Sequence, residues 1–413
     1  MYWKAPEVRA AARGGDYGRV IELVRKTGRL TQKQLGEACG LSQSAVSRLE
    51  KCGAGTYRID VLARVAAYLQ IPPSLVGLAD HQQYALRDGS EHVERREFFG
   101  AAAAVAVTPL VAATAAADTD GGQTAALRLT TTALRRLDGS TPSRELSSSV
   151  QSHIQLIQSV TREARSDARR TRLAAVGSET ASLAGWLAWD MGDHGSARTW
   201  YGSAIRAARS AGDPLLTAYQ AGSLAQFEAH AGNGAQALSL ASRARKVLGP
   251  ERPAVADAWL SSVEALAHAA GGDERGADRA LTRSRAAAEA LPDTPPPWPW
   301  VFAFGPAKVA AVRVACGAKL GLADWVLSAD TEALGGGHEK QRALIVLDLA
   351  AGHLAAGRVE AAFALAGRAV ETGLTYRSGR IVDRARAVRR SLVLTSPPKV
   401  VREFDARLHD VYL

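Results

Sequence analysis

The chain has 413 residues, of which 47% are hydrophobic and 22% are charged, and its formal net charge is +10 at pH 7. This length predicts at least two domains, and the apolar content is large enough for sizeable cores, which excludes a mainly disordered protein. The excess of Lys and Arg indicates a polyanionic partner, although net charge alone does not distinguish nucleic acid from a membrane surface.

The N-terminal residues and the cysteines indicate a cytoplasmic protein. Residues 1–15 carry no apolar run behind their charges, so no N-terminal signal peptide is expected. Cys39, Cys52 and Cys316 give no disulfide framework, and no Cys-x-x-Cys motif or His pair accompanies them. We therefore expect free thiols in a reducing compartment, no metal site and no cofactor.

Two short helices joined by a tight turn are predicted within Leu30–Glu50. Thr31 is an N-cap candidate, and Gln34 three residues later completes a capping box, in which each side chain bonds the backbone N–H of the other residue. Gly40 supplies the left-handed conformation that ends the first helix. The expected inward positions of this helix are Leu35 and Ala38.

The second helix is capped by Ser42 and has one apolar and one polar face. Its expected inward positions are Ala45, Val46 and Leu49. The side chains between them must point outward, and they are Gln43, Ser44, Ser47 and Arg48. Gln pairs with adenine and Arg with guanine through two hydrogen bonds in the major groove, so this face predicts a base-reading helix. The alternative is that Gln43 and Ser44 are ordinary solvated surface.

The stretch from about Asp16 to Ala79 resembles the Xre/Cro-type helix-turn-helix family of bacterial and phage repressors. The Leu-Thr-Gln-x-x-Leu opening, the Gly-Leu-Ser turn, the Ser-x-Leu-Glu close and the Leu-Ala-x-x-Ala-x-Tyr-Leu continuation all fall in register. The resemblance implies a lambda-repressor-like DNA-binding domain over residues 16–79. Its five expected helices are Asp16–Thr27, Thr31–Ala38, Ser42–Lys51, Ile59–Leu69 and Pro73–Ala79.

The same resemblance implies roles for individual residues on double-stranded DNA. Gln32 would hold a phosphate at the start of its helix, where the helix dipole favours anions. The residues expected to face the major groove are Gln43, Ser44 and Arg48. The residues expected to touch the DNA backbone are Ser47, Thr56, Tyr57 and Arg58. Arg25 matches the position that pairs with Glu50 in this family, which would fix the reading helix on its support.

Residues 80–122 are predicted to link two domains, and they contain an Ala-rich segment at 98–117. Two arginines, two phenylalanines and the uncharged run that follows them resemble an export signal or a membrane span. The run is internal, consists mostly of alanine and has Pro109 in its middle, and these features disfavour membrane insertion. An inter-domain helix with a proline break is therefore expected, followed by a flexible joint.

Residues 123–413 are helical in character, beginning with two amphipathic candidates at Thr124–Leu137 and Ser143–Arg165. Four helices then end at a glycine, namely at Gly192, Gly232, Gly272 and Gly357, and the first three glycines lie 40 residues apart. Small residues follow each glycine after five positions (Ala197, Ala237, Ala277 and Ala362) and after twelve (Ala204, Ala244, Ser284 and Ala369). Such residues let antiparallel helices approach closely, and the gap before Gly357 leaves room for one irregular unit around 317–329.

This half resembles a tetratricopeptide-repeat solenoid, with a period nearer forty than the usual 34 residues. The resemblance implies a concave groove lined by the first helix of each pair, which would bind a peptide, a small molecule or a protein as effector. The candidate lining residues are Gln220, Ser223, Gln226, His230, Trp259, Ser262, Glu264, His268, Lys308 and Arg313. The Pro-rich loop at 292–304 is an exposed recognition surface or a packed insertion, and the tail at 382–413 is a solenoid cap or a dimer contact.

Two functional hypotheses from different classes remain. The chain has no phosphate-binding Gly-x-x-x-x-Gly-Lys loop, no Gly-x-Ser-x-Gly elbow and no His-Glu-x-x-His motif, so an enzyme is not expected. The first hypothesis is a homodimeric, sequence-specific transcriptional regulator whose repeats sense an effector or make the dimer. The alternative is an adaptor or membrane-tethered scaffold that uses its helix-turn-helix fold to bind protein. Gln43, Arg48 and the local basic charge favour the first.

Overall fold

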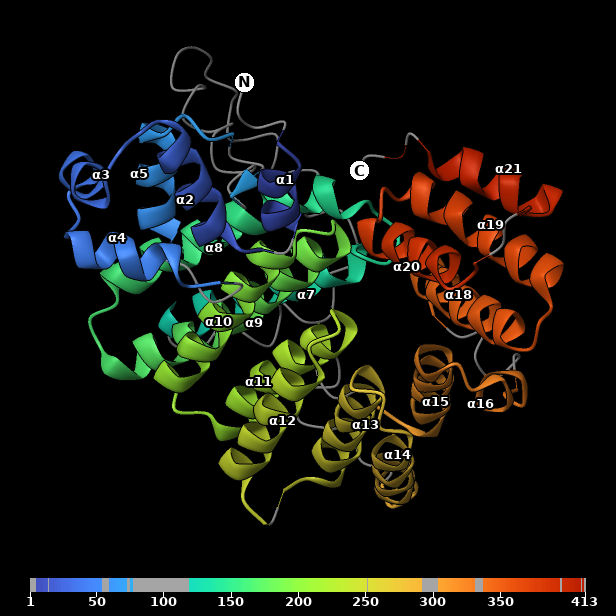
Figure 1. The fold of residues 1–413 in the computed structure, drawn as a ribbon. Coiled ribbons are helices and arrows are strands. Elements are labelled where there is room, and N and C mark those ends of the chain that lie inside the picture. Colours follow the sequence, from blue (N-terminus) through green and yellow to red (C-terminus); the bar gives the residue numbers. More distant parts are fainter. Residues whose placement is uncertain are drawn as a thin grey trace, which may run out of the picture.

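The computed structural model of this chain describes residues 5–13, 15–53, 59–72, 75–76, 119–250, 252–291, 304–330, 337–393, 396–409 and 411. Within these ranges no strand occurs, and the helices form an N-terminal cluster followed by a curved series of helical hairpins (Figure 1). The prediction of an all-α fold is confirmed. Most of the predicted helix at Pro73–Ala79 and of the predicted linker lies outside the described residues.

The N-terminal cluster contains one helix that the sequence analysis missed. Its helices are α1 (Pro6–Arg13), α2 (Tyr17–Thr27), α3 (Gln32–Cys39), α4 (Gln43–Glu50) and α5 (Ile59–Tyr68). Val8 of α1 is buried in the same core as Ile21, Leu35 and Val46. Residues 1–15 therefore include part of this domain, although their mixed charge gave no clear helical period.

The local signals of the helix-turn-helix region act as predicted. Thr31 and Gln34 form the capping box of α3, and Gly40 ends this helix with a φ of 64°. The Ser42 side chain accepts a hydrogen bond from the Ala45 backbone N–H at 3.1 Å, which caps α4. The prediction that Ala38 points inward is wrong: Ala38 is exposed and Cys39 is buried. Cys39 is one turn beyond Leu35, so these two side chains share the inward face of the helix.

The predicted repeat of helical hairpins is also confirmed. The helices are α7 (Thr119–Leu137), α8 (Ser143–Glu163), α9 (Asp167–Asp190), α10 (His194–Ser210), α11 (Pro214–His230), α12 (Gly234–Leu248), α13 (Ala254–Ala270), α14 (Glu274–Glu289), α15 (Pro306–Leu320), α16 (Ala323–Leu327), α18 (Glu339–Ala355), α19 (Val359–Thr375), α20 (Gly379–Arg390) and α21 (Lys399–Leu408). The eight predicted small positions are buried, each with at most 2% of its surface exposed. The irregular unit is α15 and α16, in which the second helix is cut to five residues.

The C-terminal part of the series returns to its beginning. Helix α20 packs against α9 as well as against α18 and α19 (Figure 1). Lys340, at the start of α18, is 1% exposed, and its Nζ donates to Asp138 Oδ1 at 2.9 Å and to Asp190 Oδ2 at 3.2 Å. Ser378, at the start of α20, donates a hydrogen bond to Asp190 Oδ1 at 2.7 Å. The tail at 382–413 thus begins within α20, the helix through which the series of hairpins closes on α9.

In the described ranges, no helix is both long and apolar enough to cross a bilayer. The Ala-rich segment at 98–117, which raised the question in the sequence, lies outside the described residues.

A buried carboxyl on α9 makes stability depend on pH. Glu179 is 1% exposed, and its burial raises its pKa from 4.5 to about 7 against the opposing charges of Arg128 and Arg135. The folded state therefore holds a proton that the unfolded chain releases, so this group lowers stability as the pH rises through that interval. Between pH 4.5 and 8, Glu179 should lower the free energy of unfolding of the wild type by about 2–3 kcal/mol. We expect the Glu179→Gln variant not to show this decrease.

Urea unfolding of the two proteins at several pH values measures this difference. Glu289→Gln, at an exposed position of α14, is the matched control and should leave the pH profile unchanged. Parallel profiles for the wild type and Glu179→Gln would show that Glu179 is ionised equally in the folded and unfolded states.

Candidate nucleic-acid interface and internal cavity

The polar face of α4 is not covered by any other described part of the chain. Gln43, Ser44 and Arg48 are exposed, and Ser47 is partly buried. On the opposite face Val46 is completely buried, with Ala45 and Leu49 partly buried beside it. The division between these faces follows the apolar spacing of the sequence, so the outward residues are free to meet a partner.

A buried ion pair fixes α4 on its support. Arg25 Nε lies 2.5 Å from Glu50 Oε1, and Arg25 Nη2 lies 3.0 Å from Glu50 Oε2. Arg25 Nη1 also donates to the Leu30 carbonyl at 2.6 Å, so the guanidinium joins α2, the following turn and α4. Gln32 Nε2 donates to Glu50 Oε2 at 2.7 Å. The Gln32 side chain is thus oriented by this pair, and its contact with a phosphate stays a prediction.

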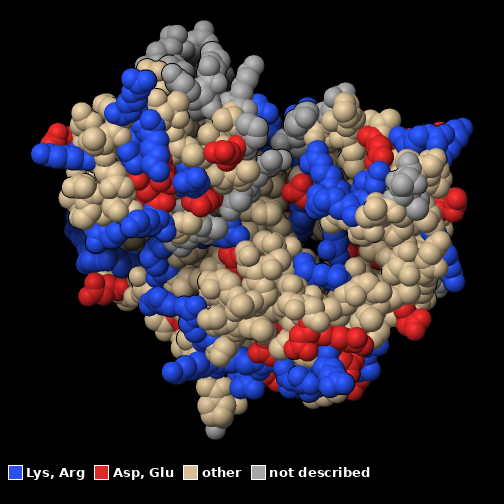
Figure 2. All heavy atoms as spheres, viewed as in Figure 1, with Lys and Arg blue, Asp and Glu red and all other residues tan. Residues whose placement is uncertain are grey.

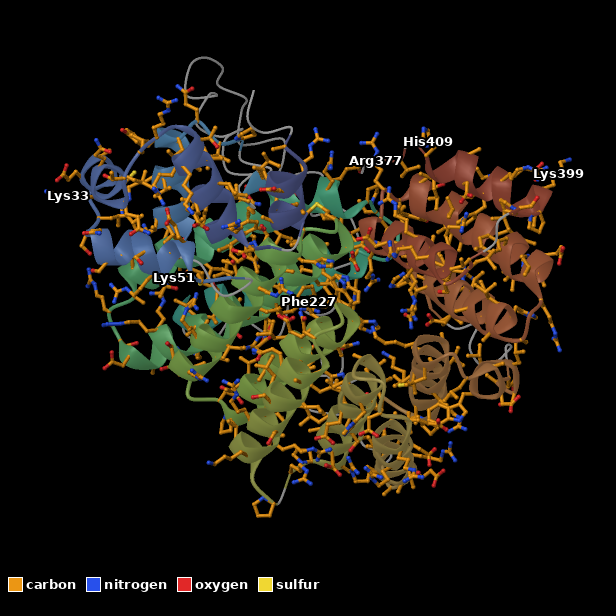
Figure 3. The ribbon with its side chains drawn as sticks, viewed as in Figure 1. Lys33, Lys51, Phe227, Arg377, Lys399 and His409 are labelled. Atoms are coloured by element: carbon orange, nitrogen blue, oxygen red, sulfur yellow. The ribbon has the colours of Figure 1, made fainter. Side chains whose placement is uncertain are left out.

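Basic side chains gather over the N-terminal helices, at the left of Figure 2. In the described part of this domain, Arg19 and Lys26 pair with Glu22, and Lys33 lies 3.9 Å from Glu37. The basic side chains without a described acidic partner are Arg29, Arg48, Lys51 and Arg64. Figure 3 shows Lys33 pointing away from the molecule and Lys51 at the end of α4. The predicted backbone contacts Thr56, Tyr57 and Arg58 lie outside the described residues.

The helix-turn-helix region is docked on the repeats through α2 and α10. Tyr17 is 3% exposed, and its hydroxyl donates to Asp193 Oδ1 at 2.9 Å. Burial and the Asp193 carboxylate both raise the pKa of Tyr17. A Cβ atom at Gly195 would lie 1.8 Å from the Tyr17 hydroxyl oxygen, so glycine is required for this approach. The same Asp193 oxygen accepts from the Ser196 backbone N–H at 2.9 Å and caps α10.

The repeats enclose a cavity of about 620 Å³ between the first helices of the hairpins. Figure 2 shows basic side chains gathered around a hollow near the centre of the view. Of the predicted groove residues, those that line the cavity are Gln226, His230, Trp259, Ser262 and Lys308. The first helix of each pair therefore lines the concave side, as expected from the repeat.

The other predicted groove residues point elsewhere. Gln220 is completely buried and donates to the Ser178 carbonyl at 3.4 Å, because it lies about 120° around α11 from Gln226. Glu264 pairs with Arg245 at 2.5 Å, and His268 lies 2.9 Å from Asp273. Arg313 packs on Trp325 with its guanidinium carbon 4.3 Å from the ring centroid. Ser223 does not line the cavity either.

One wall of the cavity is aromatic. The rings of Tyr219 and Trp259 stack with their centroids 5.1 Å apart, and Phe304 packs against the same cluster. At the other side Trp189 lies 5.2 Å from the His230 ring. Burial, followed by the nearby Arg384, holds the pKa of His230 well below its usual value, so this imidazole is neutral at pH 7. Figure 3 shows Phe227, which Trp189 contacts edge to face, near the centre of the molecule.

Helix α20 contributes a basic stripe that the sequence analysis did not place in the groove. The cavity residues on α20 are Arg380, Asp383, Arg384, Ala387 and Arg390, which share one helical face. The sequence marked this segment only as basic. Its position depends on the return of α20 to α9, a contact between segments far apart in the chain, for which local patterning carries no signal.

The start of α10 lies between the two sites. His194 lines the cavity, and the preceding Asp193 accepts the hydrogen bond of Tyr17. Burial lowers the pKa of His194, and the carboxylates around it oppose that shift. The turn at Asp193 and His194 therefore contacts both the cavity and α2, the helix that supports α4.

The comparisons with known proteins identify the N-terminal part. Residues 16–78 match the family model of a helix-turn-helix domain. None of the curated proteins compared with the chain matches it significantly.

Among solved structures, the chain is similar to Bacillus thuringiensis PlcR in its crystal structure with the peptide PapR7 and DNA, at 15% identity over 84% of this chain and 99% of that chain, with a TM-score of 0.33. A TM-score of this size is too low to establish a shared overall fold. By the family match and by the capped helices α3 and α4, residues 16–78 are a helix-turn-helix domain.

Proposed function

We propose that this protein is a sequence-specific DNA-binding transcriptional regulator whose helical repeats bind an effector. The observation that carries the proposal is the exposed polar face of α4, which no other described segment of the chain covers. In a helix-turn-helix domain the second helix enters the major groove, and an exposed face of Gln, Ser and Arg matches the donors and acceptors of base edges. The unpaired basic residues around it suit the flanking phosphates.

The residue roles follow from this docking. Arg48 would donate two hydrogen bonds to a guanine, and Gln43 would pair with an adenine. Ser47 and Gln32 would contact the DNA backbone, together with Thr56, Tyr57 and Arg58. The buried Arg25–Glu50 pair supports the proposal, because it holds the reading helix at a fixed angle to α2.

Effector control and dimerisation complete the proposal. The cavity of about 620 Å³ is in the size range of small-molecule sites, and its lining reaches α10, on which the helix-turn-helix domain rests. A homodimer would present two copies of α4 to half-sites about 34 Å apart, or a multiple of that distance. The bound sequence should then be a palindrome with that spacing.

The test is selection of bound duplexes from a randomised pool by the full-length protein, followed by affinity measurement on the selected site. We expect Arg48→Ala to weaken binding by about 1–3 kcal/mol, or about 5–150-fold, and to relax one base position, since it removes a bidentate contact. Arg368→Ala is the matched control, because Arg368 is exposed on α19 far from α4 in the chain.

Salt dependence separates this outcome from unspecific adhesion. The selected site should lose affinity steeply as salt rises, because phosphate contacts release counterions. If no sequence is enriched, or if Arg48→Ala binds the selected site as well as Arg368→Ala does, the base-reading role of α4 is wrong.

A further inference from the structure

The charged lining of the cavity contains more cations than anions. Its basic side chains are Lys308, Lys319, Arg380, Arg384 and Arg390, and its acidic side chains are Asp348 and Asp383. Arg384 forms an ion pair with Asp348, and Arg380 lies 3.6 Å from Asp190. These two arginines are therefore already neutralised by carboxylates of the protein.

Three cations of the cavity have no such partner. In the described ranges, no carboxylate forms an ion pair with Lys308, Lys319 or Arg390. The Lys319 ammonium donates to the His230 carbonyl at 3.4 Å, which is a neutral acceptor. Lys308 and Lys319 lie on the same face of α15, about 16 Å apart along the helix.

The surroundings disfavour the charge of Lys319 in the unliganded protein. Burial, followed by the charge of Arg384, lowers the pKa of Lys319 to about 8. Lys308 also lines the cavity, and its side chain is exposed to solvent. The pKa of Lys319 stays above 7, so its ammonium is largely protonated at pH 7 and the cavity holds positive charge that an added anion would stabilise.

The aromatic wall determines what accompanies the negative charge. Phe304 immediately precedes Gly305, the N-cap of α15, and it packs with the stacked rings of Tyr219 and Trp259. Lys308 in the first turn of this helix is therefore close in the chain to a flat apolar surface. Stacked rings favour a planar, apolar group.

We propose that this cavity binds a small organic anion, whose negative charge is attracted by Lys308 and Lys319 and whose flat apolar part packs on Tyr219 and Trp259. The volume of about 620 Å³ accommodates one such molecule. A carboxylate, a sulfonate or a phosphate supplies the same charge. The inference rests on the proposed function only in treating the cavity as the effector site, and it is tested without DNA.

Two fluorescent probes with the same aromatic skeleton isolate the effect of charge. Anilinonaphthalene-8-sulfonate carries a sulfonate, and N-phenyl-1-naphthylamine lacks it. We expect the full-length protein to bind the sulfonate about tenfold more tightly or better at low salt, because the unpaired cations attract only the charged probe.

Matched variants assign the charge to the cavity. The double variant Lys308→Gln, Lys319→Gln should bind the sulfonate probe no more tightly than the neutral probe, because the cations that attract the sulfonate are gone. Its affinity for the neutral probe should stay within about twofold of the wild-type value, because that probe carries no charge to attract. Lys308→Gln alone should act in the same direction without risk to folding, since this side chain is exposed and makes no described contact. Lys246→Gln, at an exposed position of α12, is the control.

Equal affinity of the wild type for the two probes would overturn the inference. Unchanged sulfonate binding in the double variant, with circular dichroism showing intact helices, would overturn it as well. Failure of the DNA selection alone would leave the inference in place and count against the proposed function, so the two failures are distinguishable.

Discussion

Lys340→Met should lower the free energy of unfolding of the helical-repeat domain by about 3–5 kcal/mol, the usual cost of removing one partner from a buried charge pair. Lys340 Nζ contacts Asp138 Oδ1 at 2.9 Å, Asp190 Oδ2 at 3.2 Å and Ser143 Oγ at 3.2 Å. Methionine fills a similar volume but leaves the Asp138 and Asp190 carboxylates with less compensation. Urea unfolding followed by circular dichroism measures the loss.

The pH dependence identifies the mechanism of this loss. Burial tends to raise the pKa of Asp190, but Arg380, Lys340 and the hydroxyls of Ser143 and Ser378 outweigh burial and hold the pKa below its usual value. The contribution of Asp190 is thus present near neutral pH and lost as the pH falls through the folded pKa. The deficit of Lys340→Met should therefore shrink in acid.

The control for Lys340 is Lys399→Met on α21, labelled in Figure 3, whose ammonium is 3.6 Å from Glu403 on an exposed surface. Such surface pairs contribute about 0–1 kcal/mol, so this variant should unfold almost as the wild type does. Equal stability of the two variants would mean that the closure contact between α18 and α9 contributes little.

Glu50→Ala should destabilise the helix-turn-helix domain by about 3–5 kcal/mol, because it leaves the Arg25 guanidinium buried without its carboxylate. Arg25 and Glu50 are each 7% exposed, so water replaces the lost partner poorly. The variant also removes the acceptor of Gln32 Nε2. Hydrogen exchange of the amides in α2, α3 and α4 should accelerate, while amides of α11 to α14 keep their protection.

Glu37→Ala provides the comparison within the same domain. Glu37 lies 3.9 Å from Lys33, and both side chains are exposed. Its loss should change exchange in α3 only slightly. If Glu50→Ala exchanged as slowly as Glu37→Ala, the ion pair would not be what holds α4 on α2.

The sequence predicted the elements whose cause is local. A capping box at Thr31 and Gln34, a glycine with positive φ at Gly40 and an N-cap at Ser42 each act within one helical turn, so the boundaries of α3 and α4 could be read directly. The predictions failed where a second surface decides the outcome. Helix α1 is amphipathic over only eight residues, which is too short for a clear helical period. What places it in the domain is the burial of Val8 in the core.

The same distinction between local and long-range causes separates the two candidate sites. The outward face of α4 follows from the spacing of Ala45, Val46 and Leu49 within one helix. The cavity, by contrast, is lined by residues that the fold brings together from seven helices. Gln226, His230 and Lys308 were predicted because they lie on the first helices of hairpins, which a repeat places on the concave side. The arginines of α20 were missed because the hairpin pattern does not say how far the series curves.

The sequence by itself determined the two kinds of structure in this protein, a capped helix-turn-helix and a chain of hairpins with small residues at their crossings. Only the tertiary structure decided that the hairpins close on themselves and that the helix-turn-helix rests on α10. Lys340 meets Asp138 across 202 positions of the chain, and Tyr17 meets Asp193 across 176. Contacts at such separations depend on small rotations that accumulate from hairpin to hairpin, and no local periodicity encodes their sum.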